Sequence, residues 1–304
     1  MKCLVTGGAG FIGSHLVNKL LQEKHEVLVI DDLSMGKREN LNPKADFYRL
    51  DICDFEKISP LFKGSDCVFH LAAIPRVPLS IKNPIKTSRV NIMGTINVFK
   101  AAVDNKVKRV IFSSSSSIYG DQEKLPLKES MVPNPKSPYG LQKLVGEQFG
   151  RLFAKLYNIP IVSLRYFNVY GPGIDFNSDY SLVLGKFLRL SAQQKPLTIY
   201  GDGEQTRGFC YVSDVVEANI KAAESKNING GELINIGQEK SYSVNYLSQL
   251  IGGKVRHLPE RPGDVRHTQA DISLAKKLLS WEPKIDFIKG VELTKQWFET
   301  YGKE

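Results

Sequence analysis

The chain opens with the stretch Met1-Lys2-Cys3-Leu4-Val5-Thr6-Gly7-Gly8-Ala9-Gly10-Phe11-Ile12-Gly13, an apolar run that leads into a glycine-rich turn. The apolar part, Lys2–Thr6, has the length and composition of a short buried strand. The stretch Phe11–Glu23 follows as an amphipathic helix, because Ile12, Leu16 and Leu20 recur at helical spacing. A strand, a glycine turn and a helix in this order predict the first unit of a parallel α/β sheet.

The spaced glycines of this turn have different conformational uses. Gly7 permits a tight turn, Gly10 lets the backbone approach a pyrophosphate, and Gly13 allows the helix to pack closely on the strand. The N-terminus of the following helix would present N–H groups and a partial positive charge to phosphates. The turn therefore predicts a dinucleotide-binding site.

Acidic residues follow the second predicted strand, Val27–Ile30. A carboxylate at this position, Asp31, would accept hydrogen bonds from the adenosine ribose and repel a 2′-phosphate, which favours NAD over NADP. Asp32, directly after it, is a further candidate for contact with the cofactor. Lys37 and Arg38 instead favour NADP, since a nearby cation would accommodate the 2′-phosphate.

The strand–helix alternation continues through the first 170 residues. Further strands are predicted at Phe47–Leu50, Cys67–Leu71, Arg109–Ser113 and Ile161–Tyr166, and helices at Thr87–Asn105 and Ser137–Tyr157. This alternation predicts a doubly wound parallel sheet with helices on both faces. After about residue 170, glycine and proline interrupt the pattern more often, which predicts a smaller mixed α/β domain over residues 171–304.

Length and composition are those of an ordinary globular protein. The 304 residues are 42% hydrophobic and 24% charged, which excludes disorder, collagen and coiled coil as the main architecture. No stretch approaches the ~20 apolar residues that cross a bilayer, and the N-terminal apolar run is too short for a secretory signal. We therefore expect a cytoplasmic protein that does not bind membranes.

The net charge does not indicate nucleic-acid binding, and the cysteines do not indicate a metal site. The net charge of +9 is scattered, and the densest basic segments, 106–109 and 254–257, are shorter than the runs of about 5–8 that indicate nucleic-acid binding. Cys3, Cys53, Cys67 and Cys210 lack metal-ligand spacing, so we expect reduced thiols and no metal site.

An acid–base pair is predicted in the second half of the first domain. Tyr139 and Lys143 are four residues apart, which places both on one face of the predicted helix. A nearby ammonium and a positively charged nicotinamide would favour the phenolate of a group whose unperturbed pKa is about 10. Tyr139 would then remove a hydroxyl proton while hydride leaves the same carbon. Ser113–Ser117 follow a buried strand, at the edge where parallel sheets bind ligands.

In combination, these motifs resemble the extended short-chain dehydrogenase/reductase family, specifically its nucleotide-sugar epimerases and dehydratases. The resemblance covers nearly the whole chain. Its motifs are Thr6–Gly13, Asp51-Ile52, His70-Leu71-Ala72-Ala73, Asn91 with Gly94-Thr95, the serines before Ile118-Tyr119-Gly120, Ser137-Pro138-Tyr139-Gly140 with Lys143, Arg165-Tyr166-Phe167-Asn168, and Gly201-Asp202-Gly203 leading to Arg207 and Asp214.

The resemblance implies a Rossmann domain over residues 1–170 that binds NAD, with segments of about 205–240 returning to it, and a nucleotide-sugar domain over 171–304. The implied cofactor contacts are Gly7, Gly10, Phe11, Ile12, Gly13, Asp31, Asp32, Asp51, Ile52, Leu71, Ala72, Ala73, Asn91, Ser113, Tyr139, Lys143 and Tyr166. The implied catalytic residues are Tyr139, Lys143, Ser115, Ser116 and Ser117. The implied substrate contacts are Ser115, Asn168, Arg207, Arg261, Asp264 and Thr268.

The resemblance also suggests which reaction to expect. Family dehydratases carry Asp-Glu where this chain has Ser116-Ser117, and the decarboxylase branch tends to carry Glu at the second position. Without a carboxylate to drive elimination, we expect a 4-epimerase, an isomerase that removes and returns hydride at the sugar C4 through a 4-keto intermediate. Thr268 matches the gate beside the sugar C2 substituent, and its small size should admit an acetamido group.

We therefore expect UDP-N-acetylglucosamine and UDP-glucose, with their C4 epimers, as substrates. UDP-glucuronate remains an alternative, because Arg76 departs from the family's Ser in the segment Arg76–Ser80 and would suit a carboxylate. The rival hypotheses are an NADP-dependent keto-sugar reductase and a non-catalytic dinucleotide sensor or RNA-binding relative. The family usually dimerises by pairing two helices per subunit, for which the stretches Thr87–Asn105 and Ser137–Tyr157 are the candidates.

Overall fold

The molecule is built around one parallel sheet. The computed structural model describes residues 1–176, 182–260 and 264–302. Seven strands form the sheet in the order β11-β6-β5-β4-β1-β2-β3, all parallel. Their bounds are β1 Lys2–Thr6, β2 Glu26–Ile30, β3 Asp46–Tyr48, β4 Cys67–His70, β5 Arg109–Ser115, β6 Ile161–Tyr166 and β11 Leu233–Ile236. The strand order reverses between β1 and β4, which is where such sheets bind ligands.

Alternate residues of the strands face two separate cores. Cys3 and Val5 of β1 join a core with Leu16 and Leu20 of helix α1 (Phe11–Gln22) and with helix α8 (Val212–Glu224). Leu4, between them, belongs to the other core, which includes Val98 and Phe99 of α5 (Thr95–Asp104) and Phe153 of α6 (Pro138–Tyr157). Because successive strand residues point to opposite faces, helices on both sides are needed to bury them. The doubly wound prediction is thereby confirmed.

The sequence predicted six of the seven sheet strands to within two residues at either end, but it missed β11, and one helix was wrong. The stretch Thr87–Asn105 is not a continuous α-helix. It divides into α4 (Pro84–Ser88), a π-helical turn η3 (Arg89–Gly94) and α5. The Asn91 side chain, inside the π turn, bonds the backbone of Ile74 in a neighbouring loop. A bulge of this kind is typical of functional sites, and here it presents Asn91 to the loop after β4.

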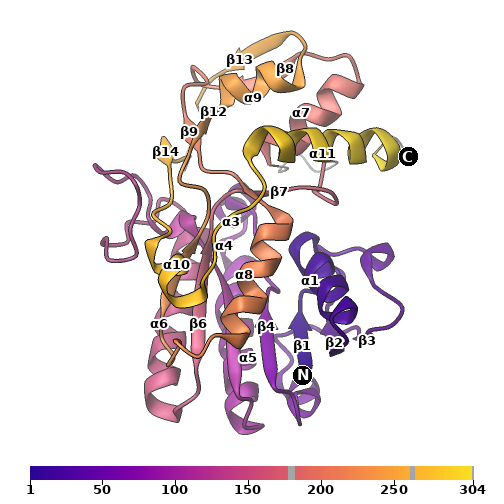
Figure 1. Cartoon of the computed structure of the whole chain (residues 1–304), viewed down its shortest axis with the longest axis vertical. Helices are drawn as coiled ribbons and strands as arrows, with labels where there is room; N and C mark the ends of the chain where they lie inside the picture. The colour runs from indigo at the N-terminus through magenta and orange to yellow at the C-terminus, as the bar shows by residue number, and fades with distance from the viewer. Residues whose placement is uncertain (177–181, 261–263, 303–304) are drawn as a thin grey trace.

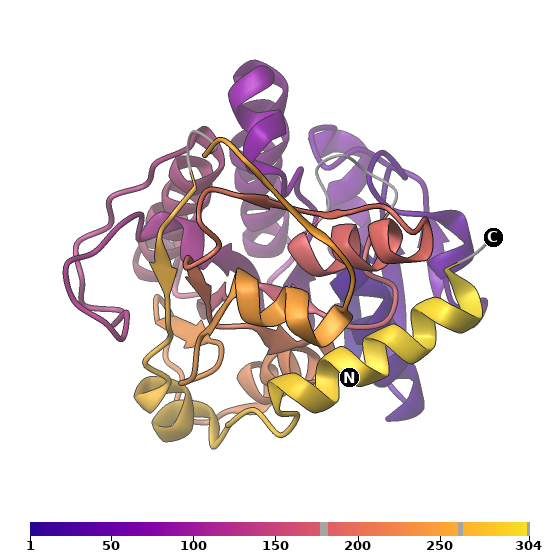
Figure 2. The same cartoon turned by 90° about the horizontal axis from the view of Figure 1, so that it is seen from above.

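The second half of the chain adds small sheets and further helices above the carboxyl ends of the main strands (Figure 1). The small sheets pair β7 (Val169–Tyr170) with β10 (Cys210–Tyr211), β8 (Leu197–Tyr200) with β13 (Val255–Leu258), and β9 (Thr206–Arg207) with both β12 (Tyr242–Ser243) and β14 (His267–Thr268). Figure 2 shows α7 (Val183–Ala192), α9 (Val244–Ile251) and α11 (Phe287–Tyr301) lying over the sheet.

Two later segments return to the main sheet. Strand β11 pairs with β6, and α8 packs against α1 on the sheet's face. Arg109, the first residue of β5, donates to the carbonyls of Ala222, Ala223 and Ser225 at the C-terminal end of α8. We retain the division near residue 170, with a return over about 205–240, as a proposal. In the part of the chain that the structure describes, no helix is long and apolar enough to span a membrane.

Candidate active site

The glycine turn lies tightly against the loop that follows β4. Gly7 has a φ of +77°, and a Cβ there would lie 2.6 Å from the backbone nitrogen of Ala72. A Cβ on Gly13 would lie 2.1 Å from the Gly7 carbonyl oxygen, so the start of α1 packs directly on the turn. A Cβ on Gly10 would meet only that same oxygen, at 3.2 Å. The side of the turn at Gly10 is therefore open for a pyrophosphate, with Phe11 and Ile12 in the first turn of α1 beside it.

Asp31 holds the glycine turn from the end of β2. Its carboxylate is buried and accepts the N–H of Ala9 at 3.0 Å and the N–H of Leu33 at 2.8 Å. Burial raises the pKa of Asp31, although these two N–H groups oppose the shift. Asp32 is more exposed and accepts the N–H of Ser34. The sequence argument assigned Asp31 to the ribose and missed that it also braces the turn.

Asp51 and Ile52 lie on the loop after β3, facing the π turn. The Asp51 carboxylate accepts the N–H of Cys53 at 2.8 Å and lies 3.4 Å from the Arg89 guanidinium. Ile52 is buried, and a Cβ on Gly94 would lie 2.6 Å from its side chain. The glycine of the Asn91–Thr95 motif is therefore explained by close packing of the π turn on this loop.

The loop after β4 is tied to both β1 and the π turn. Leu71 donates its N–H to the Thr6 carbonyl at 3.0 Å, and Ala72 donates its N–H to the Thr6 hydroxyl at 3.3 Å. Ala73 follows, half-buried, and then Ile74 donates to the Asn91 side chain at 2.8 Å. These bonds fix the predicted cofactor residues Leu71, Ala72 and Ala73 beside the glycine turn.

A buried histidine that the sequence analysis left without a role supports this loop. His70, at the end of β4, hydrogen-bonds the Thr6 hydroxyl through Nδ1 at 2.8 Å and the Thr95 hydroxyl through Nε2 at 2.9 Å. Burial and the nearby Lys143 lower the pKa of His70 to about 3, so the ring is neutral at physiological pH. A lone histidine inside an otherwise apolar strand is the signal that could have pointed to such a buried network.

The predicted acid–base pair lies in the first turns of α6. Ser137 caps this helix by accepting the Gly140 N–H at 3.2 Å, and the Tyr139 N–H donates to the Ser80 hydroxyl at 3.1 Å. Lys143 donates from Nζ to the Ser113 carbonyl at 2.6 Å. Both Tyr139 and Lys143 are buried. The helix therefore brings the phenol and the amine to the carboxyl end of β5, as the spacing predicted.

Burial moves the pKa values of these two groups in opposite directions. It raises the pKa of Tyr139 to about 12, while the Ser115 hydroxyl and the Arg76 charge lower it. It lowers the pKa of Lys143 to about 7, while Glu147 raises it. Desolvation of the phenol is the largest influence on the pKa of Tyr139, and the groups that oppose it are Ser115 and Arg76 rather than the expected Lys143.

The serines after β5 form a tight turn beside Tyr139. Ser115 accepts the Ser117 N–H at 3.1 Å and donates its hydroxyl to that of Ser117 at 3.0 Å. Ser116 is buried, and Ser113 reaches Lys143 through its carbonyl. Ser114 faces the other way and donates to Glu147. Ser115 is therefore the hydroxyl of this run that acts directly on Tyr139.

Tyr166 is the last residue of β6, and Asn168 lies two residues after it. Their side chains have different partners. The Tyr166 hydroxyl donates to the Asn219 side chain of α8 at 2.7 Å, inside the core. Asn168 donates from its amide to the Thr268 hydroxyl at 3.1 Å and to the Gly208 carbonyl at 3.3 Å. Asn168 thus joins the cluster predicted to bind substrate, whereas the Tyr166 hydroxyl is engaged by the α8 side chain.

Arg207 and Thr268 lie side by side on the paired strands β9 and β14. Arg207 donates from Nη1 to the carbonyls of Thr206 and Arg266, at 3.0 and 3.2 Å. Burial lowers its pKa, opposed by the charges of Asp264 and Asp121. Asp264 therefore lies close enough to act on Arg207, as predicted for residues of one diphosphate site. Arg261, also predicted for this site, lies outside the described residues.

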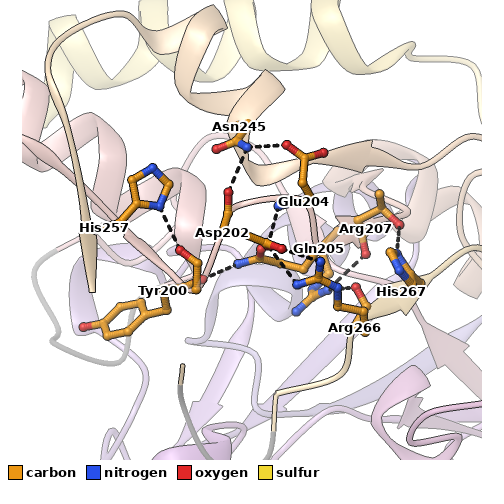
Figure 3. Close-up of polar contacts among 11 residues, drawn as sticks. Tyr200, Asp202, Glu204, Gln205, Arg207, Asn245, His257, Arg266 and His267 are labelled. Carbon is orange, nitrogen blue, oxygen red and sulfur yellow. Dashed lines mark hydrogen bonds and ion pairs between the residues drawn. The ribbon is translucent and has the colours of Figure 1, made fainter. Parts of the chain in front are cut away.

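The loop that leads to Arg207 is clamped from two sides (Figure 3). Arg266 makes a two-point contact with the Asp202 carboxylate, at 2.8 and 2.6 Å. Asn245 of α9 donates to the Asp202 carbonyl at 3.0 Å and to the Glu204 carboxylate at 2.6 Å. A Cβ on Gly203 would lie 2.0 Å from the Asn245 side chain, so this glycine is required by the close approach. The sequence analysis found the motif but not these clamps.

The chain is similar over nearly its whole length to known proteins. The model of the NAD-dependent epimerase/dehydratase family matches residues 3–237. UDP-glucose 4-epimerase of Mycolicibacterium smegmatis is 35% identical over 312 residues, covering 98% of each chain. The structure of Thermotoga maritima UDP-glucose 4-epimerase with UDP-glucose has a TM-score of 0.95 at 39% identity, covering 100% of each chain. Methanobrevibacter ruminantium UDP-N-acetylglucosamine 4-epimerase, in complex with UDP-N-acetylmuramic acid, has a TM-score of 0.93 at 41% identity, covering 98% of each chain.

These similarities span the whole length of the relatives, and they agree with the open glycine cradle at the switch point of the sheet. The cofactor is accordingly NAD, and the resemblance drawn from the sequence motifs is confirmed. This protein is an enzyme of the NAD-dependent epimerase/dehydratase family.

Proposed function

We propose that this enzyme is a UDP-hexose 4-epimerase. The observation that carries the proposal is the placement of Tyr139, Lys143 and Ser115 together at the carboxyl end of β5, next to the loops that form the NAD cradle. A base and a hydroxyl beside a dinucleotide site suit removal of a proton from a sugar hydroxyl. Arg207, across the site, supplies a guanidinium suited to a diphosphate.

The proposed mechanism divides the work among these residues. Tyr139 takes the proton from the sugar O4 and later returns it, with Ser115 hydrogen-bonded to the reacting oxygen. The glycine turn would hold NAD, which would supply the acceptor and donor for the hydride of the sugar C4, and Lys143 would hold the nicotinamide ribose. Arg207 and Asn168 hold the nucleotide diphosphate, so the sugar ring is free to turn and present its opposite face.

The serines that precede the Ile118-Tyr119-Gly120 motif, in place of carboxylates, favour epimerisation over elimination or decarboxylation. Within the described chain, the groups that oppose the raised pKa of Tyr139 are the Ser115 hydroxyl and the Arg76 guanidinium. Ser116 and Ser117 stand where a dehydratase carries its acid–base pair. Loss of water needs a second positioned acid–base group. Simple removal and return of hydride needs none.

The proposed substrates are UDP-N-acetylglucosamine and UDP-glucose with their C4 epimers. Thr268 is buried beside Asn168, and its small side chain supports room for an acetamido group at the sugar C2. The test is incubation with a panel of UDP-sugars and separation of the C4 stereoisomers. We expect interconversion without net formation of NADH. Accumulation of a keto sugar or of UDP-xylose would overturn the proposal, as would net reduction with stoichiometric use of NADPH.

A second candidate substrate is UDP-glucuronate, favoured by Arg76. The Arg76 guanidinium forms a 2.9 Å ion pair with Asp175, and its buried Nε has no hydrogen-bond partner. Its charge also acts on Tyr139, which places it at the reacting end of the site. A cation there suits a sugar carboxylate. The same panel decides: faster conversion of UDP-glucuronate than of the neutral sugars would make the uronate the substrate.

We also propose that the enzyme is a homodimer. The stretches named from the sequence expose large apolar side chains, namely Met93 of η3 and Leu141, Leu152 and Leu156 of α6. Ile85 of α4, two residues before the first of these stretches, is exposed as well. These residues define the α4–α6 face, and α6 packs against both α4 and η3. Ile85 is 84% exposed, which is unusual for isoleucine in a monomer. A second copy pairing the same helices would cover this face.

A further inference from the structure

A buried carboxylate lies one helical turn after Lys143. Glu147 is fully buried on α6 and accepts hydrogen bonds from the neighbouring strands β5 and β6. Arg165 of β6 donates from Nε to Oε1 at 2.9 Å and from Nη2 to Oε2 at 2.8 Å. Ser114 of β5 donates its hydroxyl to Oε1 at 2.5 Å. Glu147 is thus fixed in one position by groups that belong to the two strands flanking the catalytic helix.

We propose that Glu147, held by Arg165 and Ser114, is a positioning residue that keeps the Lys143 side chain positively charged at the carboxyl end of β5. The proposal rests on the role proposed above for Lys143, which needs a charged amine beside the cofactor. No part of it requires Glu147 to contact substrate or cofactor.

The surroundings of Lys143 explain why it needs a carboxylate. Its Nζ donates to the Ser113 carbonyl at 2.6 Å and lies 4.9 Å from the centre of the Phe112 ring. The carbonyl and the aromatic ring both stabilise an ammonium. The free-energy penalty for burying the charge is larger than the stabilisation that these two contacts provide. Burial lowers the pKa of Lys143 to about 7, and Glu147 is the group that raises it. Without Glu147 the amine would lose its proton at a lower pH.

The other titratable groups around Lys143 carry no negative charge. His70 of β4 is neutral, and burial raises the pKa values of Tyr139 on α6 and Tyr166 on β6, so both phenols stay protonated. Arg165 on β6 is a cation. Among the groups facing Lys143 in the described structure, Glu147 therefore supplies the negative charge.

Arg165 has further partners that hold it in place. Its Nη1 donates to the Tyr119 hydroxyl at 2.8 Å, and its guanidinium lies 4.8 Å from the centre of the Tyr119 ring. Tyr119 in turn donates to the Asn235 side chain of β11 at 2.7 Å. Glu147 therefore cannot turn away from the Lys143 side of α6 without breaking bonds to a framework of three strands.

The direct test measures the pKa of Lys143 by NMR in protein labelled with ¹³C at the lysine ε-carbons, with Lys143→Met to assign the signal. We expect Glu147→Gln to lower this pKa by at least ~1 unit, a shift typical of losing one close opposite charge. Glu147→Asp keeps the negative charge, so the pKa of Lys143 in this variant should stay close to the wild-type value. An unchanged Lys143 pKa in folded Glu147→Gln protein would overturn the proposal.

Two further variants control for misfolding and for general charge effects. Glu147→Gln leaves Arg165 buried without its partner, so the double variant Glu147→Met/Arg165→Met replaces the whole pair by apolar side chains that can pack. It should fold, and because it removes a cation together with the carboxylate, its Lys143 pKa should lie above that of Glu147→Gln protein. Glu292→Gln removes a like charge from the surface of α11 and should leave the Lys143 pKa unchanged. A Lys143 pKa in folded Glu147→Asp protein as low as that in Glu147→Gln protein would also overturn the proposal.

Turnover separates this inference from the proposed function. If Lys143 must be charged, the alkaline limb of the pH profile of turnover moves to lower pH in Glu147→Gln, because its ammonium is lost earlier. A shifted Lys143 pKa in a protein that epimerises no UDP-sugar would leave the inference standing and remove the function. Epimerase activity of the wild-type enzyme, together with an unshifted Lys143 pKa in Glu147→Gln, would support the proposed function and overturn the inference about Glu147.

Discussion

At the residue scale, the same physical cause acts on both members of the catalytic pair. Burial raises the pKa of Tyr139 and lowers that of Lys143, so burial favours the neutral form of each group. Tyr139 therefore carries its proton at neutral pH unless further positive charge is placed beside it. The site is consequently suited to a base that becomes active only when a cation lies against it.

The first prediction concerns Tyr139. Replacing it with phenylalanine removes the proton acceptor and should lower turnover by at least ~10², the usual value of a positioned acid–base group. Binding of UDP-sugar, measured by calorimetry, should change little, since the residues proposed to hold the nucleotide are Arg207 and Asn168. Tyr157→Phe, at the exposed end of the same helix, is the matched control. Near-normal turnover of the Tyr139 variant would remove this residue from the mechanism.

A second prediction concerns the size of the sugar pocket. Thr268→Tyr should reduce turnover of UDP-N-acetylglucosamine more than that of UDP-glucose, because the larger ring fills the space beside the C2 substituent. Rates on both substrates measure this ratio directly. Thr268→Ser keeps the hydroxyl that binds Asn168 and should preserve the wild-type ratio. Equal loss on both substrates would show that Thr268 does not act as a gate.

Sequence reasoning proposed residues for the chemistry and predicted where they lie, but it missed the side chains that hold them in place. Tyr139, Lys143 and the glycines follow local spacing rules, so their positions could be predicted from the chain alone. The partners of Glu147 come from strands far apart in sequence, and no local pattern specifies such a contact. A signal was nevertheless present: Arg165 is a charged residue inside the apolar strand Ile161–Tyr166, which indicates a buried partner.

At the element scale, helix α6 does most to position the site. Its first turn holds Tyr139, its second Lys143 and its third Glu147. The helix was predicted to within one residue because its apolar periodicity and its cap, Ser137, are local features. The π turn η3 was not predicted, because its cause is a contact between Asn91 and a distant loop. Periodicity cannot show an interruption that tertiary hydrogen bonds impose.

A third prediction follows from the cap of α6. Ser137→Ala removes the acceptor for the Gly140 N–H and should lower the free energy of unfolding by about 1 kcal/mol. It should also reduce turnover, because Tyr139 lies in the turn that the cap fixes. Asp286→Ala removes the equivalent cap of α11 and should cost similar stability without the loss of turnover. Denaturant titration and rate measurements on both variants separate the two effects.

At the scale of the whole molecule, the site depends on parts of the chain that are remote from one another. The first half supplies the NAD cradle and the acid–base pair. The second half supplies Arg207 and Thr268 on short strands that pair with each other. Their clamps, such as Asp202 with Arg266, join loops more than fifty residues apart. The irregularity seen after residue 170 is thus the form expected of a domain specialised for binding.

A fourth prediction tests the α4–α6 face. Wild-type enzyme should sediment at twice the 34.0 kDa mass of the chain. Leu152→Glu and Ile85→Glu place charges on the covered apolar face and should yield monomers. Val132→Glu, at a residue 80% exposed in the loop before α6, should leave the dimer intact. Monomeric wild-type protein at micromolar concentration would contradict the proposed assembly.

The late return of β11 to the sheet bears on how the protein is made. Until residues up to Ile236 have emerged from the ribosome, β6 remains an edge strand with unpaired N–H and C=O groups. Helix α8, which covers α1 and accepts the Arg109 side chain at its end, is also synthesised late. The growing chain therefore carries an unpaired sheet edge from the completion of β6 at Tyr166 until the completion of β11 at Ile236.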